Sequence, residues 1–295
     1  CAEWAASRKQ FGQAIGRFQG TSFKLADMVT ELQAADLLVM HAARKADAGT
    51  MVPADAAMAK LYASEMLQRV ADNAVQIFGG MGFSADAPME AAWRDARISR
   101  IYEGTNEINR MLAVGMLVKK AMKGHVDLLN PAMAVGEELT GIPSFDTPDY
   151  SEVLSEEKAM VGKLKKVFLM VAGSAIQKYG PELEEHQQLL MAASDILIEI
   201  YMAESTILRT EKNVKRFGED AQKEQIAMAQ LYLYHAVDTI TQKAKEGIVS
   251  FAEGDEQRMM LMGLKRFTKY QNQPNVIALR NLIAEKVTSE NTYPF

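Results

Sequence analysis

The sequence contains a single cysteine, Cys1, so no disulfide can form within the chain, which fits a reducing compartment. No apolar run approaches the ~18 residues that a membrane span requires, and no signal peptide is recognisable. The net charge of −5 is too small and of the wrong sign for a nucleic-acid-binding protein that works by charge alone. The four histidines are widely spread without metal-ligand spacing, so we expect no metal site.

Strands also have little support. Aromatic residues make up only 7% of the chain, and no sustained alternation of polar and apolar residues occurs. The helical period dominates instead, and the hydrophobic fraction of 48% is enough for a large core. We expect helices over residues 21–48, 53–79, 88–98, 105–120, 151–179, 181–217, 220–252, 255–270 and 274–289. The sequence therefore predicts an all-α fold.

Residues that break helices gather between positions 123 and 150, where several glycines and prolines fall close together. We therefore predict an up-down helical bundle at 1–122, a linker at 123–150 and a second helical bundle at 151–295. The chain opens without Met in what reads as the middle of a helix, so we expect a fragment of a longer protein.

Glu103 is the first candidate for chemistry. It lies between two predicted helices in the segment RIYEGTNEINR, and Gly104 after it permits close approach of a ligand. The apolar neighbours Ile101 and Tyr102 could desolvate the carboxyl group and raise its pKa toward that of a useful base. The alternative, which the local pattern alone favours, is a solvated glutamate that caps a helix.

Two further segments have the same ambiguity. The glycines of VQIFGGMGF, at positions 79, 80 and 82, could let backbone amides approach phosphates, but a helix precedes them rather than a strand, so a helix end and a turn is the simpler reading. In SRKQFGQAIGRFQ, Arg8 could meet a phosphate and Phe11 or Gln19 could line an aromatic ring system. Taken alone, that segment is better explained as an ordinary basic helix end.

Together and in this order, the three segments resemble the acyl-CoA dehydrogenase family over residues 1–120. The resemblance implies that Glu103 removes the α-proton of a fatty acyl thioester while a hydride passes from the β-carbon to FAD, which gives a trans-2-enoyl-CoA. It implies substrate contacts at Tyr102 and Gly104. The FAD-binding residues that it implies are Arg8, Gln10, Phe11, Gln19, Gln76, Gly79, Gly80 and Thr105, with Arg8 and Phe11 reaching a neighbouring subunit's FAD.

The second half and the ending VTSENTYPF resemble the extra C-terminal domain of the very-long-chain type, which implies a homodimer. The resemblance also implies an electron-transfer flavoprotein as partner, and a cytoplasmic location in a bacterium or the mitochondrial matrix in a eukaryote. Residues 163–178 are a candidate for peripheral membrane contact, but a core helix with a solvated basic end is the favoured explanation. Because the family's N-terminal helical and middle β domains are absent, a non-catalytic helical assembly or dimerisation module is the alternative function.

Overall fold

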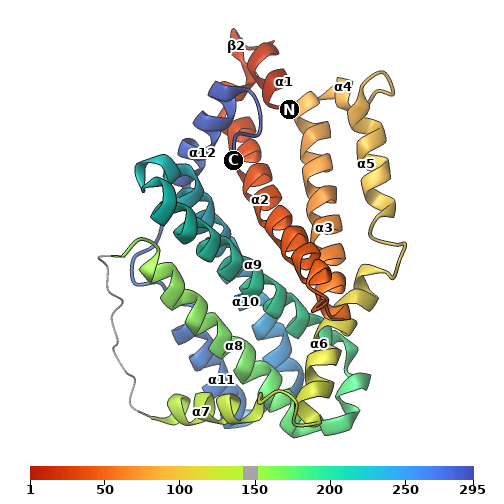
Figure 1. The fold of residues 1–295 in the computed structure, drawn as a ribbon, viewed down its shortest axis with the longest axis vertical. Coiled ribbons are helices and arrows are strands. Elements are labelled where there is room, and N and C mark those ends of the chain that lie inside the picture. Colours follow the sequence, from red (N-terminus) through yellow and green to blue (C-terminus); the bar gives the residue numbers. More distant parts are fainter. Residues whose placement is uncertain (142–151) are drawn as a thin grey trace.

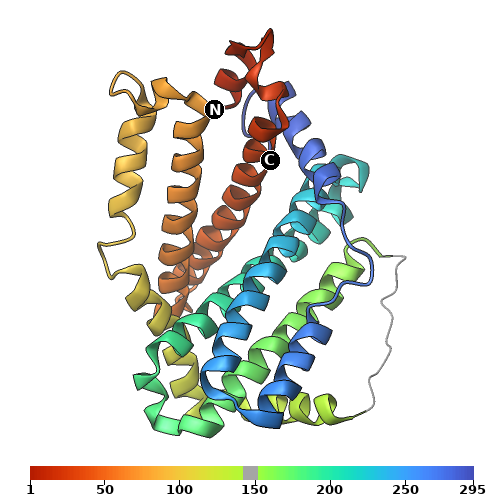
Figure 2. The same cartoon turned by 180° about the vertical axis from the view of Figure 1, so that it is seen from behind.

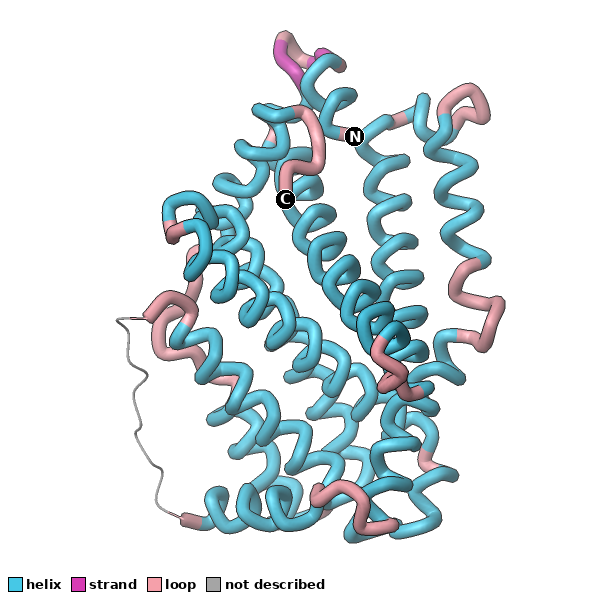
Figure 3. The backbone as a smooth tube through the Cα atoms, viewed as in Figure 1, coloured by secondary structure: helices cyan, strands magenta, loops and turns pink. Residues whose placement is uncertain are grey.

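The computed structural model describes residues 1–141 and 152–295, and in these ranges it is almost entirely helical (Figure 1). This confirms the predicted all-α fold. The described residues contain only two short strands, β1 (Lys9–Gln10) and β2 (Gln13–Ala14), which pair antiparallel. Figure 3 shows this small hairpin projecting at one tip of the molecule.

The first part of the chain contains two long helices that pack against each other, with shorter helices around them. Its helices are α1 (Ala2–Ser7), the 3₁₀ helix η1 (Ile15–Arg17), α2 (Gln19–Asp47), α3 (Pro53–Phe78), α4 (Gly80–Phe83), α5 (Pro88–Ile98) and α6 (Asn106–Met122). Pro53 occupies the first turn of α3, where its missing N–H costs nothing. Asp55 accepts a hydrogen bond from the Val52 N–H at 2.9 Å and one from Lys45 of α2 at 2.7 Å, which fixes the turn between α2 and α3.

The second part is built around the long helices α8, α9 and α10. Its helices are α7 (Leu129–Thr140), α8 (Ser155–Tyr179), the 3₁₀ helix η2 (Gly180–Glu185), α9 (Gln187–Phe217), the 3₁₀ helix η3 (Asp220–Gln222), α10 (Lys223–Phe251), α11 (Gly254–Phe267) and α12 (Val276–Glu290). The predicted helix start at Pro181 was wrong, because residues 180–185 form a 3₁₀ turn before α9 begins.

Part of the predicted linker forms helix α7, which packs against α8 and α11. Two glycines make this close approach possible. A Cβ atom at Gly173 would lie 2.3 Å from the Ala132 Cβ, and one at Gly263 would lie 2.4 Å from a methyl carbon of Leu139. Residues 129–140 of the predicted linker are therefore helical, and the linker as a boundary between domains stays a prediction. The rest of it, from position 142 on, and the predicted start of the second bundle at 151 lie outside the described residues.

One large cluster of buried side chains runs through both parts of the chain. It includes Leu38 and Met66 from the first part, together with Leu164, Ile196 and Ile248 from the second. The C-terminal helix α12 also returns to pack on α2 (Figure 2). The two predicted bundles thus share a core, and their boundaries as separate domains stay a prediction.

The segment at 163–178 lies inside α8, and its apolar side chains face the core. Leu164, Val167 and Val171 are fully buried. This confirms the expectation of a core helix. Among the helices of the described ranges, none combines the length and apolar character that crossing a membrane requires.

Candidate functional site

The loop between α5 and α6 has an unusual backbone at Glu103 and Gly104. Glu103 has a φ of 55° and Gly104 a φ of 84°. A side chain at a positive φ is strained by ~1–3 kcal/mol, and such strain persists where the surroundings hold it in place. At position 104 a Cβ atom would also lie 3.3 Å from the side-chain nitrogen of Asn109. The loop therefore requires glycine at 104 and holds Glu103 in a fixed, strained conformation.

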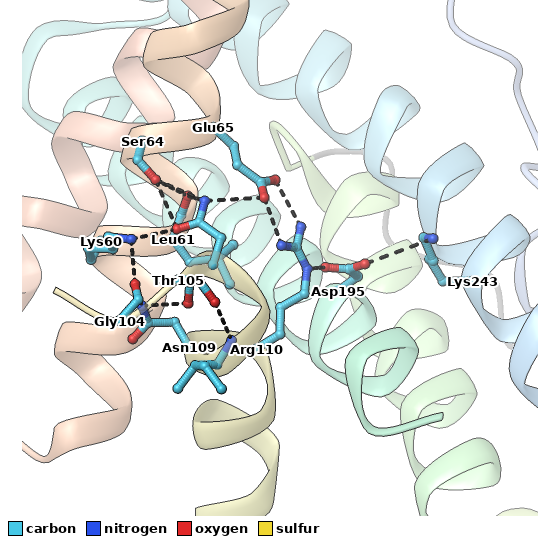
Figure 4. Close-up of polar contacts among 12 residues, drawn as sticks. Lys60, Leu61, Ser64, Glu65, Gly104, Thr105, Asn109, Arg110, Asp195 and Lys243 are labelled. Carbon is cyan, nitrogen blue, oxygen red and sulfur yellow. Dashed lines mark hydrogen bonds and ion pairs between the residues drawn. The ribbon is translucent and has the colours of Figure 1, made fainter. Parts of the chain in front are cut away.

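Two side chains hold the loop through one carbonyl group (Figure 4). The Gly104 carbonyl oxygen accepts hydrogen bonds from Lys60 Nζ at 2.7 Å and from Asn109 Nδ2 at 2.8 Å. Thr105 caps helix α6 by accepting the Ile108 N–H at 3.4 Å. This confirms the predicted helix start, while a role for Thr105 at a cofactor stays a prediction. Burial lowers the pKa of Lys60, although the nearby carboxylates of Glu103 and Glu107 act in the opposite direction.

Asn106 connects the loop to the side of α3. Its side-chain oxygen Oδ1 accepts a hydrogen bond from Lys60 at 2.8 Å, and its side-chain nitrogen Nδ2 donates to the Ser64 hydroxyl at 3.0 Å and to Glu65 at 3.3 Å. Asn106 is only 3% exposed, so these bonds form away from solvent, where each is harder to replace by water.

Arg110 extends this connection to the second part of the chain. Its two terminal nitrogens donate to the two carboxylate oxygens of Glu65 at 2.7 and 2.9 Å, and its Nε donates to Asp195 of α9 at 2.6 Å. Burial acts to raise the pKa of Glu65, but the hydrogen bonds and charge of Arg110 outweigh it, and the pKa is lowered. For Asp195 burial prevails over Arg110, and its pKa is raised. These residues border a cavity of about 510 Å³ between α2, α3, α6, α9 and α10.

The side chains of Glu103 and Tyr102 are exposed to solvent beside this hydrogen-bonded network. Both residues are exposed, Tyr102 by 52%, and Gly104 beside them is exposed as well. The chain by itself thus fixes the backbone of Glu103 but does not supply the desolvation that we expected from Ile101 and Tyr102. Chemically, the loop presents a carboxylate on a rigid support to whatever covers this surface.

The predicted residues near the N-terminus lie around the β1–β2 hairpin. Arg8 follows α1, Gln10 is in β1, Phe11 is in the hairpin turn and Gln19 begins α2. Phe11 has a φ of 50° and is 93% exposed, with its ring edge-on to Phe18 at a centroid distance of 6.2 Å. The hairpin therefore presents an aromatic side chain to solvent from a strained turn, beside the exposed Arg8.

Gln76 is in the last turn of α3, Gly79 follows α3 and Gly80 begins α4. In Figure 1, α4 lies at the same end of the molecule as the hairpin. The two segments are joined by Trp4 of α1, which stacks on Phe78 of α3 with ring centroids 4.7 Å apart. All three predicted residues are exposed, and a Cβ atom at Gly79 or Gly80 would have no neighbour within 4 Å in the described part of the chain. Gly79 also ends α3 with a φ of 63°, which confirms the helix end that we expected there.

The structure brings the predicted site residues together in two separate groups. Lys60, which contacts the Glu103 loop, and Gln76 lie sixteen positions apart on α3. At a rise of about 1.5 Å per residue they are separated by about 24 Å along the helix. Within one chain, the hairpin group and the glutamate loop therefore do not form one compact site.

The residues that hold the loop were not singled out from the sequence. Asn106, Asn109 and Arg110 lie at helical spacing in the first turns of α6, so their common face was readable from NEINR. The sequence around Lys60 gave no indication that this side chain contacts the Glu103 loop. Asp195 is 85 positions from Arg110, and only the tertiary fold brings them together.

Both parts of the chain are similar to known proteins. Residues 1–116 match a family described as "Acyl-CoA dehydrogenase, C-terminal domain", and residues 163–266 match a second family with the same description. Over 287 residues, and 91% of its length, the chain is 34% identical to a probable acyl-CoA dehydrogenase of Bacillus subtilis, of which it covers 48%. Over 118 residues it is 45% identical to a subunit of the caffeyl-CoA reductase–Etf complex of Acetobacterium woodii, which involves 40% of the chain and 31% of that protein.

A solved structure is similar over the whole chain. The crystal structure of an acyl-CoA dehydrogenase complexed with FAD from Bacillus anthracis is 35% identical and superposes with a TM-score of 0.92. The superposition covers 100% of this chain and 52% of that one. The chain thus spans about half the length, or less, of the relatives that it matches.

Proposed function

The chain belongs to the acyl-CoA dehydrogenase family, and we propose that it forms the C-terminal, flavin-facing part of an enzyme that oxidises fatty acyl-CoA to trans-2-enoyl-CoA. The observation that carries this proposal is the loop at Glu103, where a carboxylate is presented at a positive φ and its backbone is fixed by Lys60 and Asn109. A strained, well-supported acid is characteristic of a functional group rather than of a solvated helix cap.

In this proposal Glu103 removes the α-proton of the acyl thioester. The proton is weakly acidic, so the base must be desolvated and the thioester oxygen stabilised when they meet. Because Glu103 is exposed in this chain, the desolvation comes from segments beyond these 295 residues and from the substrate itself. Tyr102 and Gly104, on either side of the base, are proposed to contact the acyl-CoA.

FAD is the proposed cofactor, and the exposed groups of the chain fit it. Arg8 offers a cation for a pyrophosphate, Phe11 an aromatic face, and the open backbone at Gly79 and Gly80 allows close approach of a ligand. Gln10, Gln19, Gln76 and Thr105 complete the proposed set. The chemistry that bound FAD supplies is acceptance of the hydride from the β-carbon.

A homodimer accounts for the two separate groups of residues. If the hairpin with Arg8 and Phe11 reaches the flavin of a second subunit, it need not lie near the Glu103 loop of its own chain. The exposed and strained Phe11 supports this arrangement, because such a side chain gains most by being covered. An electron-transfer flavoprotein is the proposed acceptor of the electrons, and the relative in an Etf complex supports this partner. The very-long-chain type stays a proposal for the substrate class.

The alternative function, a helical assembly module without activity, applies to the chain on its own. It is supported by the exposure of Glu103 and by the coverage of only about half of the full relatives.

Both functions are tested by comparing the 295-residue chain with a full-length parent protein. We expect the full-length protein to be yellow and its flavin absorbance to bleach when acyl-CoA is added without oxygen. The chain alone should be helical and colourless. A flavin-loaded parent that no acyl-CoA reduces would contradict the proposed enzyme.

A further inference from the structure

The guanidinium group of Arg110 connects three helices beside the Glu103 loop. It belongs to α6, the helix that this loop begins, and it pairs with Glu65 of α3 and Asp195 of α9. All three side chains are mostly shielded from water, with exposures of 18% for Arg110, 23% for Glu65 and 18% for Asp195. Short, charge-assisted hydrogen bonds, especially bidentate ones between arginine and a carboxylate, are among the strongest in proteins.

A continuous chain of contacts runs from Asp195 to the loop. Asp195 holds Arg110 through Nε, Arg110 holds both oxygens of Glu65, and Glu65 accepts a hydrogen bond from Asn106. Lys60 in turn donates hydrogen bonds both to the Asn106 side chain and to the Gly104 carbonyl group next to Glu103. Figure 4 shows the network extending from the loop to Asp195 and on to Lys243 of α10, whose Nζ lies 4.0 Å from the Asp195 carboxylate.

The geometry at Arg110 explains why Asp195 matters for the loop. A guanidinium group is flat, so an acceptor at Nε fixes the plane in which the two terminal nitrogens lie. With Asp195 in place, both of these nitrogens face Glu65. Without the Asp195 charge, Arg110 can turn, and Glu65 loses the partner that keeps it within reach of Asn106.

We propose that Asp195, in the second helical part of the chain, is a positioning residue for Glu103. The second part thereby contributes to catalysis as well as to assembly. This inference rests on the proposed function, in which Glu103 is the base. Asp195 itself does not contact the loop, and its effect passes through Arg110, Glu65 and Asn106.

The same cavity offers a matched control. Arg69 of α3 donates to Glu31 of α2 at 2.7 Å, and both residues line the cavity with Asp195. Their ion pair joins two helices as the Arg110 pairs do, but neither side chain is hydrogen-bonded or ion-paired with residues 103–106. Loss of the Glu31 charge therefore removes an ion pair from the same cavity, although a more exposed one, while leaving the path to the loop intact.

The kinetic test uses the full-length parent protein with four forms: wild type, Asp195→Asn, Asp195→Glu and Glu31→Gln. A displacement of ~1 Å at a catalytic group costs up to ~100-fold in rate, so we expect kcat to fall about 10- to 100-fold in Asp195→Asn. KM for acyl-CoA and the FAD content should stay within about twofold. Asp195→Glu, which keeps the charge, should recover most of the loss, and Glu31→Gln should resemble the wild type.

A structural test on the 295-residue chain does not depend on activity. The Asn106 N–H donates to the Arg100 carbonyl group at 3.1 Å and closes the loop, so its hydrogen exchange reports whether the loop is held. We expect exchange at Asn106 to be at least about tenfold faster in Asp195→Asn than in Glu31→Gln.

The results separate the inference from the function on which it rests. An inactive wild-type parent would contradict the proposed function, while the exchange measurement would still test the connection to the loop. An active parent in which Asp195→Asn matches Glu31→Gln in kcat would overturn the positioning role. A variant with a lowered melting temperature but wild-type kcat would overturn it as well, because that outcome assigns Asp195 to stability alone.

Discussion

Glu199 lies on α9 at the inner wall of the cavity, and replacing it with glutamine should change how the stability of the chain depends on pH. One oxygen of its carboxyl group accepts a hydrogen bond from the Tyr232 hydroxyl at 2.9 Å. Burial is the main reason that the pKa of Glu199 is raised to about 7. The Tyr232 hydrogen bond and the charge of Arg69 lower this pKa, and the nearby Asp195 and Glu31 carboxylates raise it. The group is therefore largely protonated in the folded chain at pH 6.

The sign of the effect follows from the two pKa values. In the unfolded chain the carboxyl group has its ordinary pKa of 4.5, so between pH 4.5 and about 7 unfolding releases a proton. The stabilisation is present in full below pH 4.5 and is lost as pH rises through about 7. At 1.36 kcal/mol per pKa unit, the difference between 4.5 and about 7 corresponds to about 3 kcal/mol.

Urea unfolding of the 295-residue chain at pH 5 and pH 8 measures this quantity. Relative to Glu199→Gln, the wild-type chain should lose up to about 3 kcal/mol of unfolding free energy between these pH values. Glu204→Gln on the same helix is the control, since its side chain is 38% exposed. If the stabilities of wild type and Glu199→Gln changed in parallel with pH, Glu199 would not be a neutral acid in the folded chain and the reasoning would be refuted.

Three further substitutions test other parts of the structure. Arg8→Ala in the full-length parent should weaken FAD binding, measured by flavin titration, and leave substrate reduction of the remaining holoenzyme nearly unchanged; normal FAD affinity would count against a shared site. Gly104→Ala should lower kcat at least about tenfold with little change in helical circular dichroism, because a Cβ atom there meets Asn109 at 3.3 Å and the φ of 84° disfavours alanine. An unchanged kcat would show that the loop conformation is dispensable. Gly173→Ala should lower the unfolding free energy of the chain by ~1–3 kcal/mol, since the added Cβ overlaps Ala132 of α7; a stability equal to wild type would show that α7 does not pack there.

The long helices could be predicted from the sequence because their signals are local. The apolar period, Pro53 at a helix start and Gly79 at a helix end all report on neighbouring residues, and α3 and α5 were predicted to within one residue. Helix α7 was missed because Asn130, Pro131 and Gly136 read as helix breakers. Pro131 instead occupies the first turn of α7, and packing on α8 stabilises the rest.

The candidate site divides in the same way. Glu103 and Gly104 could be predicted from a short sequence motif, because the positive φ at position 104 requires glycine. The connection from Asp195 through Arg110 was not, because its members come from three helices and meet only after folding. The distance between the hairpin and the glutamate loop also depends on the length and direction of α3. A short sequence motif does not predict such a distance.

The central claim is that Glu103 is the base, and single-turnover reduction of FAD by acyl-CoA tests it most directly. Glu103→Gln keeps the shape of the side chain and removes its ability to accept a proton. Glu107→Gln is the matched control, since Glu107 is also exposed and lies four positions later in the first turn of α6. In the full-length parent, we expect flavin reduction to slow by at least about 1,000-fold in Glu103→Gln with FAD still bound, and by less than about threefold in Glu107→Gln. Flavin reduction in Glu103→Gln at close to the wild-type rate would contradict the claim.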